Sequence, residues 1–318
     1  MNLAARPVAL LLSSVLALAW SHSLLAEEKH PLPATVADGA KLETEYEAPG
    51  ATLEGPVWDL KTKKLYFTWF GPKATRIMRL DERGKATVWA DNTKGVNGTC
   101  LGIDGRLIGA AAYGHFVISY EIGPNGPTDS KILYENKKLF QPNDVCQAPN
   151  GNIYFTDPDF DHSKKSAVYL LTPNGKAKAV VHDAKVTNGV RTSLDGKTLY
   201  VSDDGPSNWR AYPIQKDGTV GPGYVFFDPP TADKGSPDGM GLDEHGNLYA
   251  SGRGGVWACD KNGKSLGFIP IPEFCSYASF GGEDGKTLYF TTQAGGGKPS
   301  HVYSIKMKVR GGQWAGKK

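Results

Sequence analysis

Six segments of the chain repeat one pattern of apolar and polar positions: a short apolar run, a Gly-containing turn, and a strand of alternating polarity. They are GPVWDLKTKKLYFTWF, GTCLGIDGRLIGAAAYG, DVCQAPNGNIYFTDP, GVRTSLDGKTLYVSDD, GMGLDEHGNLYASG and YASFGGEDGKTLYFTT. Alternation over a few residues is typical of a half-buried strand, and Asp-Gly and Asn-Gly accept the positive φ of tight hairpin turns. Each segment is therefore predicted to form a β-hairpin.

The hairpins recur at a regular spacing. Their second strands can be indexed at Tyr66, Ile108, Tyr154, Tyr200, Tyr249 and Tyr289, which lie 40 to 49 residues apart. A period of this length with several strands in each repeat is typical of a β-propeller. Further strand-like runs supply the outer strands, and KLETEYEA, residues 41–48, is expected to close the ring by joining the last blade. The prediction is an all-β fold, a single six-bladed β-propeller domain over residues 27–318.

One polar position precedes every indexed residue by 11 or 12 positions. It is occupied by Glu54, Asn97, Asn143, Asn188, Asp238 and Tyr277. Because the first hairpin strand of a propeller blade lines the central channel, these side chains are predicted to meet at one end of the channel axis. Taken singly, Asn-Gly, Asn-Asp and Asp-Gly pairs are ordinary turn formers. Their recurrence through six repeats favours a common site.

Two carboxylates and several amide oxygens that meet in a dry channel need a positive charge between them. Carboxylate and carbonyl oxygens are ligands for hard cations. The register therefore predicts one divalent metal ion on the channel axis, Ca²⁺ first, with Mg²⁺, Mn²⁺ or Zn²⁺ as alternatives. The register contains no His or Cys, which disfavours a dedicated zinc site.

The first residues differ in composition from the rest of the chain. One charge, Arg6, precedes an apolar run, and small residues follow the run. This order is typical of a secretory signal, here residues 1–26 with cleavage after Ala26, or after Ser23 as the alternative. An uncleaved membrane anchor is the alternative. The mature protein is expected to be exported, periplasmic or secreted, with no membrane segment after cleavage.

The net charge and the cysteines bear on nucleic-acid binding, disulfides and metal binding by thiolates. The net charge of +3 comes without a long basic run, so nucleic-acid binding is not expected. Four cysteines in an exported chain allow three disulfide connectivities. Cys100 and Cys146 each follow an Asn of the register by three residues, so they are candidates for adjacent strands and for a disulfide. There is no C-x-x-C motif that would favour metal binding by thiolates.

The chain resembles the SMP-30/gluconolactonase group, which also includes the luciferin-regenerating enzymes. The resemblance rests on EGPVWD, QPNDVCQAPNGNIYFTDP, VTNGVRTSLDGKTLYVSD, SPDGMGLDEHGNLYAS and ASFGGEDGKTLYFTT, in this order over nearly all of the mature chain. It implies a six-bladed propeller with one catalytic divalent metal on the axis and, in many members, hydrolysis of sugar lactones. Position by position, it implies that Glu54, Asn188 and Asp238 bind the metal and that Asn143 contacts metal, its water or substrate. It also implies Asp238 as the general base.

The substrate walls follow from the hairpin geometry. If the register position begins the first strand, the second strand ends at the same face, and its last residues border the ring. The candidates for substrate contact are Trp69, Tyr113, His115 and Arg253, together with Asn97, Asn143 and Tyr277 of the ring. Arg253 is a cation suited to a carboxylate or a lactone oxygen, with a surface salt bridge as the alternative. For His115 the alternative is a packed or solvated rim residue.

These features predict a metal-dependent hydrolase that opens a small-molecule lactone or ester, with Asp238 accepting a proton from the attacking water. KKLFQPND lacks the Arg that members acting on aldonolactones commonly carry before the Asn of the third blade, and AAAYGHFVIS departs from common second-blade text. The sugar-lactone specificity is therefore left open. One alternative is an organophosphate or aryl ester hydrolase with an apolar pocket around Trp69. Another is a non-catalytic ligand-binding propeller with a structural ion. The oligomeric state is open.

Overall fold

A computed structural model describes residues 30–161 and 166–316. In these residues the chain forms 24 strands, and its helical segments there are two short 3₁₀ turns, η1 (Thr231–Asp233) and η2 (Gly312–Trp314). The predicted all-β fold is confirmed. Within the same ranges no helix is long and apolar enough to cross a membrane. The predicted signal segment, residues 1–26, lies outside the described residues.

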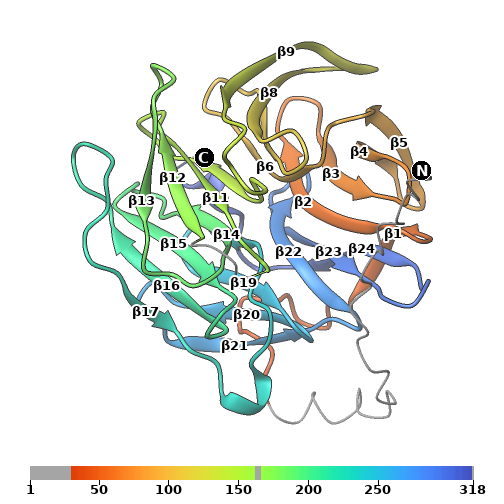
Figure 1. Ribbon diagram of the computed structural model, residues 1–318. Coiled ribbons are helices and arrows are strands. Elements are labelled where there is room, and N and C mark those ends of the chain that lie inside the picture. The colour runs from red at the N-terminus through yellow and green to blue at the C-terminus, as the bar shows by residue number, and fades with distance from the viewer. Residues whose placement is uncertain (1–29, 162–165, 317–318) are drawn as a thin grey trace, which may run out of the picture.

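The described strands group into six antiparallel units of four, and Figure 1 shows them following one another around a common centre. The first unit contains β2 (Thr52–Asp59), β3 (Lys64–Phe70), β4 (Thr75–Glu82) and β5 (Lys85–Ala90). The second contains β6 (Val96–Leu101), β7 (Leu107–Ala111), β8 (Phe116–Gly123) and β9 (Gly126–Glu135). The third contains β10 (Val145–Gln147), β11 (Ile153–Asp157), β12 (Ala167–Leu171) and β13 (Ala177–Val181).

The later units repeat this order of strands. The fourth contains β14 (Thr187–Thr192), β15 (Thr198–Asp203), β16 (Asn208–Pro213) and β17 (Tyr224–Phe227). The fifth contains β18 (Met240–Leu242), β19 (Leu248–Gly252), β20 (Gly255–Cys259) and β21 (Ser265–Pro270). The sixth contains β22 (Phe274–Gly281), β23 (Thr287–Gln293), β24 (Ser300–Lys306) and β1 (Glu43–Ala48).

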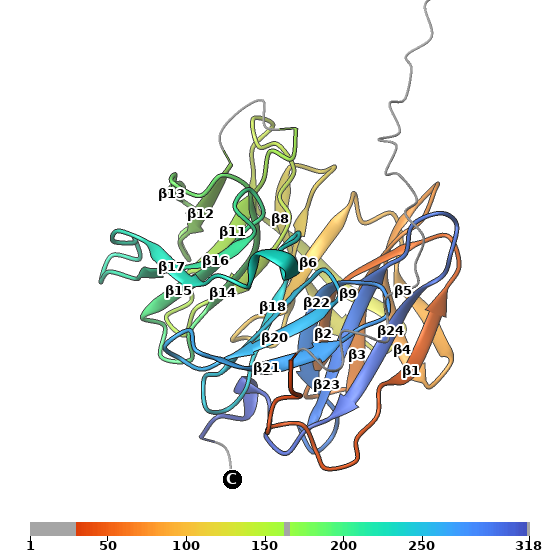
Figure 2. The same ribbon diagram turned by 90° about the horizontal axis from the view of Figure 1, so that it is seen from below.

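Strand β1 joins the two ends of the described chain. It pairs antiparallel with β24, with Glu43 opposite Ser304 and Ala48 opposite Ser300, and Figure 2 shows the two strands side by side. The prediction that residues 41–48 supply the last strand of the final unit is confirmed. The first and sixth units also meet through the pair Thr52 and Gln293, so these two units form one eight-stranded sheet.

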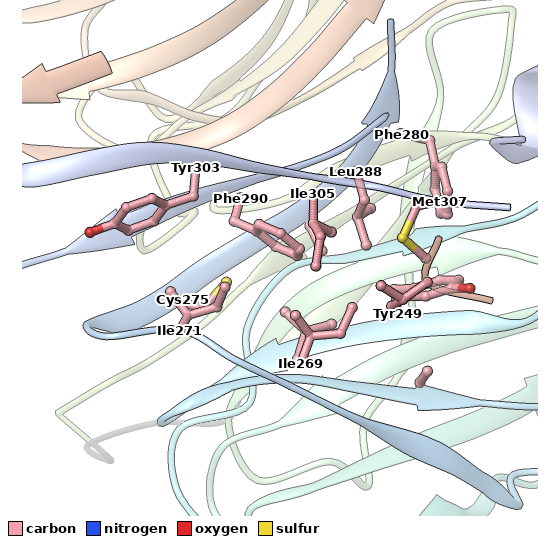
Figure 3. Packing of buried hydrophobic residues seen from close by; sticks show 14 residues of the cluster. Tyr249, Ile269, Ile271, Cys275, Phe280, Leu288, Phe290, Tyr303, Ile305 and Met307 are labelled. Carbon is pink, nitrogen blue, oxygen red and sulfur yellow. The ribbon is translucent and has the colours of Figure 1, made fainter. Parts of the chain in front are cut away.

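Alternation along each strand places apolar side chains on both faces of every unit. Tyr66 packs in a cluster shared with the second unit, whereas its neighbour Phe67 packs in a cluster shared with the sixth. The other four clusters likewise each join two successive units. Figure 3 shows the cluster between the fifth and sixth units, where Ile269 faces Leu288 and Phe290. The first strands also contact one another in chain order, and β22 contacts β2.

The cysteines answer the question of the candidate disulfide. All four are buried free thiols, including Cys100 and Cys146. These two do occupy matching registers on β6 and β10, because they pair with Ile108 and Tyr154 respectively. Cys100, however, packs between the second and third units, and Cys146 packs between the third and fourth. Each thiol therefore points toward the next unit along the chain, and no disulfide joins them.

Candidate metal centre and active site

Irregular strand pairing sets the positions of the predicted ring residues. The register shifts between Glu54 and Val57 in β2, and the corresponding shift in β14 lies between Thr187 and Val190. A β-bulge turns side chains out of the regular alternation, and bulges are frequent beside active sites. Glu54 and Asn188 lie at these bulges, where their side chains do not follow the regular alternation of the strand.

Buried hydroxyls on the second strands hold the first strands in place. They lie two residues after the indexed positions in five of the six repeats: Thr68, Thr156, Ser202, Ser251 and Thr291, all fully buried. Gly189 N–H donates to Ser202 Oγ at 2.5 Å, and Ser251 Oγ donates to the Gly239 carbonyl at 2.6 Å. The Ser202 bond satisfies a backbone N–H within the irregular pairing of β14, and the Gly239 carbonyl accepts from Ser251 N–H as well, at 3.1 Å. Sequence reasoning missed this row, although the repeat itself carries its signal.

Glu54 and Asp238 form a buried acidic pair. They are 5% and 6% exposed, and Glu54 Oε1 accepts a hydrogen bond from Gln293 Nε2 at 2.5 Å. Burial raises the pKa of Glu54 to about 8, against the opposing effect of the Gln293 bond. Burial, followed by the charge of Glu54, raises the pKa of Asp238 well above its ordinary value. The site is therefore short of positive charge.

Asn188 supplies an acceptor that no described residue satisfies. Its Nδ2 donates to the carbonyl of Pro237 at 3.2 Å, which places the side chain beside the segment that carries Asp238. Its Oδ1 is buried and has no hydrogen-bond partner among the described residues. A buried amide oxygen without a donor costs on the order of 1–3 kcal/mol. A buried amide oxygen near the segment that carries a carboxylate is a suitable ligand for a hard cation.

The two remaining Asn residues of the ring are held by their backbones. Asn143 N–H donates to the carbonyl of Thr156 at 2.9 Å, and the Asn143 carbonyl accepts from Gly98 N–H at 2.7 Å. The Asn97 carbonyl accepts from Thr68 Oγ1 at 2.9 Å. Both residues are half-buried. These bonds fix the backbones of Asn97 and Asn143 in the second and third units.

The donor set fits a divalent cation that prefers oxygen ligands. Glu54 and Asp238 offer two buried carboxylates, and Asn188 offers an unsatisfied amide oxygen. Across residues 30–161 and 166–316, no group of three His, Cys, Asp or Glu side chains is arranged to hold a metal. A cation here would therefore depend on amide oxygens as well as carboxylates.

Tyr277 does not occupy the ring position that the sequence register assigned to it. Ser279 pairs with Tyr289 as Val57 pairs with Tyr66, which places Ser276 in the position equivalent to Glu54. The sixth hairpin has one more residue between these paired positions than the first hairpin, so counting twelve residues back from Tyr289 stops one residue short of Ser276. Tyr277 is 1% exposed, and its hydroxyl donates to both carboxylate oxygens of Asp144, at 3.1 and 3.2 Å.

Sequence reasoning missed Asp144, Arg191 and the role of Gln293. Asp144 is buried, and burial raises its pKa to about 6. Arg191 Nη2 donates to the Tyr277 hydroxyl at 3.2 Å. The available signal was weak, because Asn143-Asp144 resembles a turn pair, and because Tyr277 lies far along the chain from both of its partners.

The rim candidates lie in different surroundings. Trp69 is half-buried, with the Arg76 guanidinium 5.1 Å from its ring centroid. Tyr113 is 66% exposed and meets Phe70 edge-on at 6.1 Å. Phe70 and Tyr113 line a cleft of about 340 Å³ between the first and second units.

His115 and Arg253 differ in how firmly they are held. His115 has a φ of 58°, and its Nδ1 lies 2.9 Å from the carbonyl of Leu139, which ties the ring to a neighbouring loop. Arg253 is exposed. Its backbone N–H donates to the carbonyl of Gly235 at 3.2 Å, and its guanidinium lies against that glycine.

Comparison with known proteins matches the chain to one family over most of its length. The family model described as SMP-30/Gluconolactonase/LRE-like region matches residues 52–294. A gluconolactonase from Zymomonas mobilis is 28% identical over 280 residues, which cover 75% of each chain. A pentonolactonase from Haloferax volcanii is 27% identical over 251 residues, which cover 78% of this chain and 83% of the relative.

A solved structure gives the same result. The gluconolactonase from Xanthomonas campestris superimposes with a TM-score of 0.72 and 27% identity. The match covers 86% of this chain and 92% of that one. The sequence and structural matches therefore indicate the same group of proteins.

Proposed function

This chain belongs to the SMP-30/gluconolactonase/LRE-like family, and from this we propose that it is a metal-dependent lactone hydrolase on a closed six-bladed propeller. Two relatives that it matches over three quarters of its length are named as lactonases, which supports a lactone-hydrolysing enzyme. The six four-stranded units and the contacts of their first strands support the closed propeller. Support for lactone chemistry comes from the family, and support for the ion comes from the site.

One observation carries the metal proposal: the Oδ1 of Asn188 is buried and unsatisfied, on a side chain whose amide contacts Pro237, the residue before Asp238 of the acidic pair. We propose that these three residues hold one divalent cation, Ca²⁺ in the first place, with Asn143 contacting the ion, its water or the substrate. A cation would offset the two buried charges and satisfy the amide oxygen at once.

When bound, the cation supplies an electrophile for the lactone carbonyl and lowers the pKa of a nearby water. Asp238, ionised beside the cation, accepts the proton of the attacking water. The water oxygen bonds to the carbonyl carbon, the ring C–O bond breaks, and the proton passes from Asp238 to the departing ring oxygen. The product is the open-chain hydroxy acid. Gln293 holds one oxygen of Glu54 in place throughout.

The substrate is proposed to lie against the rim of the first and second units. The cleft beside Phe70 and Tyr113 offers aromatic surface there, and Asn97 of the second unit is proposed to contact the substrate as well. Arg253 is proposed to bind a polar substituent of the substrate from the fifth unit. An aryl ester or phosphotriester would use the same aromatic surface and is the second candidate substrate class.

Residues 1–26 are proposed to be a cleaved signal, so that the enzyme acts in the periplasm or outside the cell. Sequencing the N-terminus of the protein recovered from a periplasmic or culture fraction tests this. A mature chain that begins at residue 27 agrees with the proposal, and an intact Met1 in the cytosolic fraction contradicts it.

The test of the activity is a panel of lactones, aryl esters and phosphotriesters assayed with and without chelator. We expect turnover of lactones that chelation abolishes and Ca²⁺ restores. Asp238→Asn is expected to lose turnover, whereas the matched variant Asp243→Asn is expected to keep it, since Asp243 is buried in a turn and accepts backbone N–H groups of His245 and Asn247. Lactone turnover that chelation leaves unchanged would contradict the metal, and a binding-only protein would turn over no member of the panel.

A further inference from the structure

Two buried side chains, Asp144 and Tyr277, and one half-buried side chain, Arg191, form a network further along the first strands than the candidate ligands. The Tyr277 hydroxyl donates to the Asp144 carboxylate at 3.1 and 3.2 Å and accepts from Arg191 Nη2 at 3.2 Å. Asp144, Arg191 and Tyr277 lie on or immediately before three different first strands, β10, β14 and β22. We call these three residues the brace.

The Asp144 end of the brace is tied to two segments that carry ligands. Asp144 directly follows Asn143, and its Oδ1 accepts from Val145 N–H at 2.8 Å. Its Oδ2 accepts from Val190 N–H at 2.8 Å, two residues after Asn188. One carboxylate therefore fixes the spacing between the bulge of the fourth unit and the start of the third.

The other two members tie the brace to the segment that carries Asp238. The Tyr277 ring lies so close to Gly239, the residue after Asp238, that a Cβ at position 239 would collide with it. Arg191 Nε donates to the carbonyl of Met240 at 3.1 Å. The backbone that follows Asp238 is thus held from both sides.

We propose that the brace is a positioning device for the metal site, an inference that rests on the proposed function. It fixes the segments of Asn143, Asn188 and Asp238 relative to one another before a cation binds. Ligands that are already held need little ordering on binding, so a site with an intact brace binds its cation more tightly. Tyr277 is on this view a positioning residue, and it does not contact the substrate.

Tyr277→Phe is the direct test, because it keeps the ring and removes both hydroxyl bonds. Tyr249→Phe is the matched control: Tyr249 is also fully buried, and its hydroxyl bonds to Thr35 and Asp243, outside the site. Calorimetric titration of chelator-treated protein with Ca²⁺, in the absence of substrate, measures the affinity. We expect Tyr277→Phe to lose affinity by roughly 10-fold or more, the range typical of residues that orient metal ligands. The control is expected to stay close to wild type.

Kinetics separate positioning from substrate contact. At saturating Ca²⁺ the KM of Tyr277→Phe for a lactone is expected to match that of the wild type. Unchanged Ca²⁺ affinity overturns the brace, and a raised KM at unchanged affinity assigns Tyr277 to the substrate instead. If Tyr277→Phe does not fold, Arg191→Lys carries the same test, because a lysine keeps the charge but cannot reproduce the two directed donors.

The same titration distinguishes the two proposals. A wild-type protein that binds no divalent cation refutes the proposed metal site, and the brace with it. A wild type that binds Ca²⁺ while both variants bind it equally well refutes the brace alone.

Discussion

Removal of the cation is expected to make the stability of the protein depend on pH in the neutral to alkaline range. Without a cation, burial raises the pKa of Glu54 to about 8, from an ordinary value of 4.5. The pKa of Asp238 is raised in the same direction by burial and by the charge of Glu54. Both groups then favour the protonated, neutral form in the folded state.

The sign and size of the effect follow from proton linkage. A carboxyl whose folded pKa exceeds its unfolded pKa contributes its full stability below the unfolded pKa and loses it as the pH rises through the folded pKa. Each pH unit in that window changes the free energy of unfolding by roughly 1.4 kcal/mol. From about pH 6.5 to the folded pKa of Glu54, that residue alone lowers the free energy of unfolding by about 2 kcal/mol. At ~2–4 °C per kcal/mol, the melting temperature is expected to fall by ~4–8 °C, and Asp238 adds to this.

The assay is calorimetric unfolding of chelated and Ca²⁺-loaded protein at several pH values from about 6.5 to 9. Since cation binding requires ionised ligands and releases protons, the stabilisation by Ca²⁺ is expected to grow with pH as that of the chelated protein declines. Glu54→Gln removes one titrating group and is expected to decline less steeply than the wild type, with the remainder due to Asp238. The reasoning is refuted if the chelated wild type has a constant melting temperature across this range, or if Glu54→Gln declines as steeply.

Three further outcomes are expected. Asp238→Asn should lower kcat on a lactone by roughly 10²–10⁴-fold with a retained fold by circular dichroism, and near-wild-type kcat would exclude it as the general base. Gly239→Ala should lower the free energy of unfolding by roughly 1–3 kcal/mol in denaturant titration, because the added methyl meets the Tyr277 ring; an unchanged midpoint would contradict that packing. A reductant should leave the melting temperature unchanged, because Cys100 and Cys146 are free thiols; a fall on reduction would indicate a disulfide.

The repeat in the sequence predicted the part of the fold that depends on local pattern. Hairpin signals at regular spacing gave the first two strands of each unit, and residues 41–48 were correctly placed beside the final strand. The same spacing led to Glu54, Asn188 and Asp238, whose segments the structure brings together. Local pattern suffices here because a repeated unit places its equivalent residues at equivalent points of the assembly.

Contacts between distant units could not be read in this way. The bond between Tyr277 and Asp144 joins residues 133 positions apart, and no spacing rule connects them. The sixth hairpin also has one additional residue before Tyr289. A fixed count back from Tyr289 therefore assigned Tyr277 to the ring position that Ser276 occupies. The candidate disulfide between Cys100 and Cys146 is absent for a related reason: matching positions on neighbouring strands do not imply that side chains face each other.

The symmetry of the repeat and its exceptions carry different information about the site. The position that follows each ring residue is glycine in four units, and a Cβ at Gly98 or Gly239 would collide with Asp144 or Tyr277. Asp144 and Tyr277 are the two exceptions at that same position, in the third and sixth units. Glycines thus leave the space that the two large side chains fill, so that the brace and the glycines form one packing unit. The regular positions predict where a ligand ring forms, and the departures from regularity identify the residues that hold it in shape.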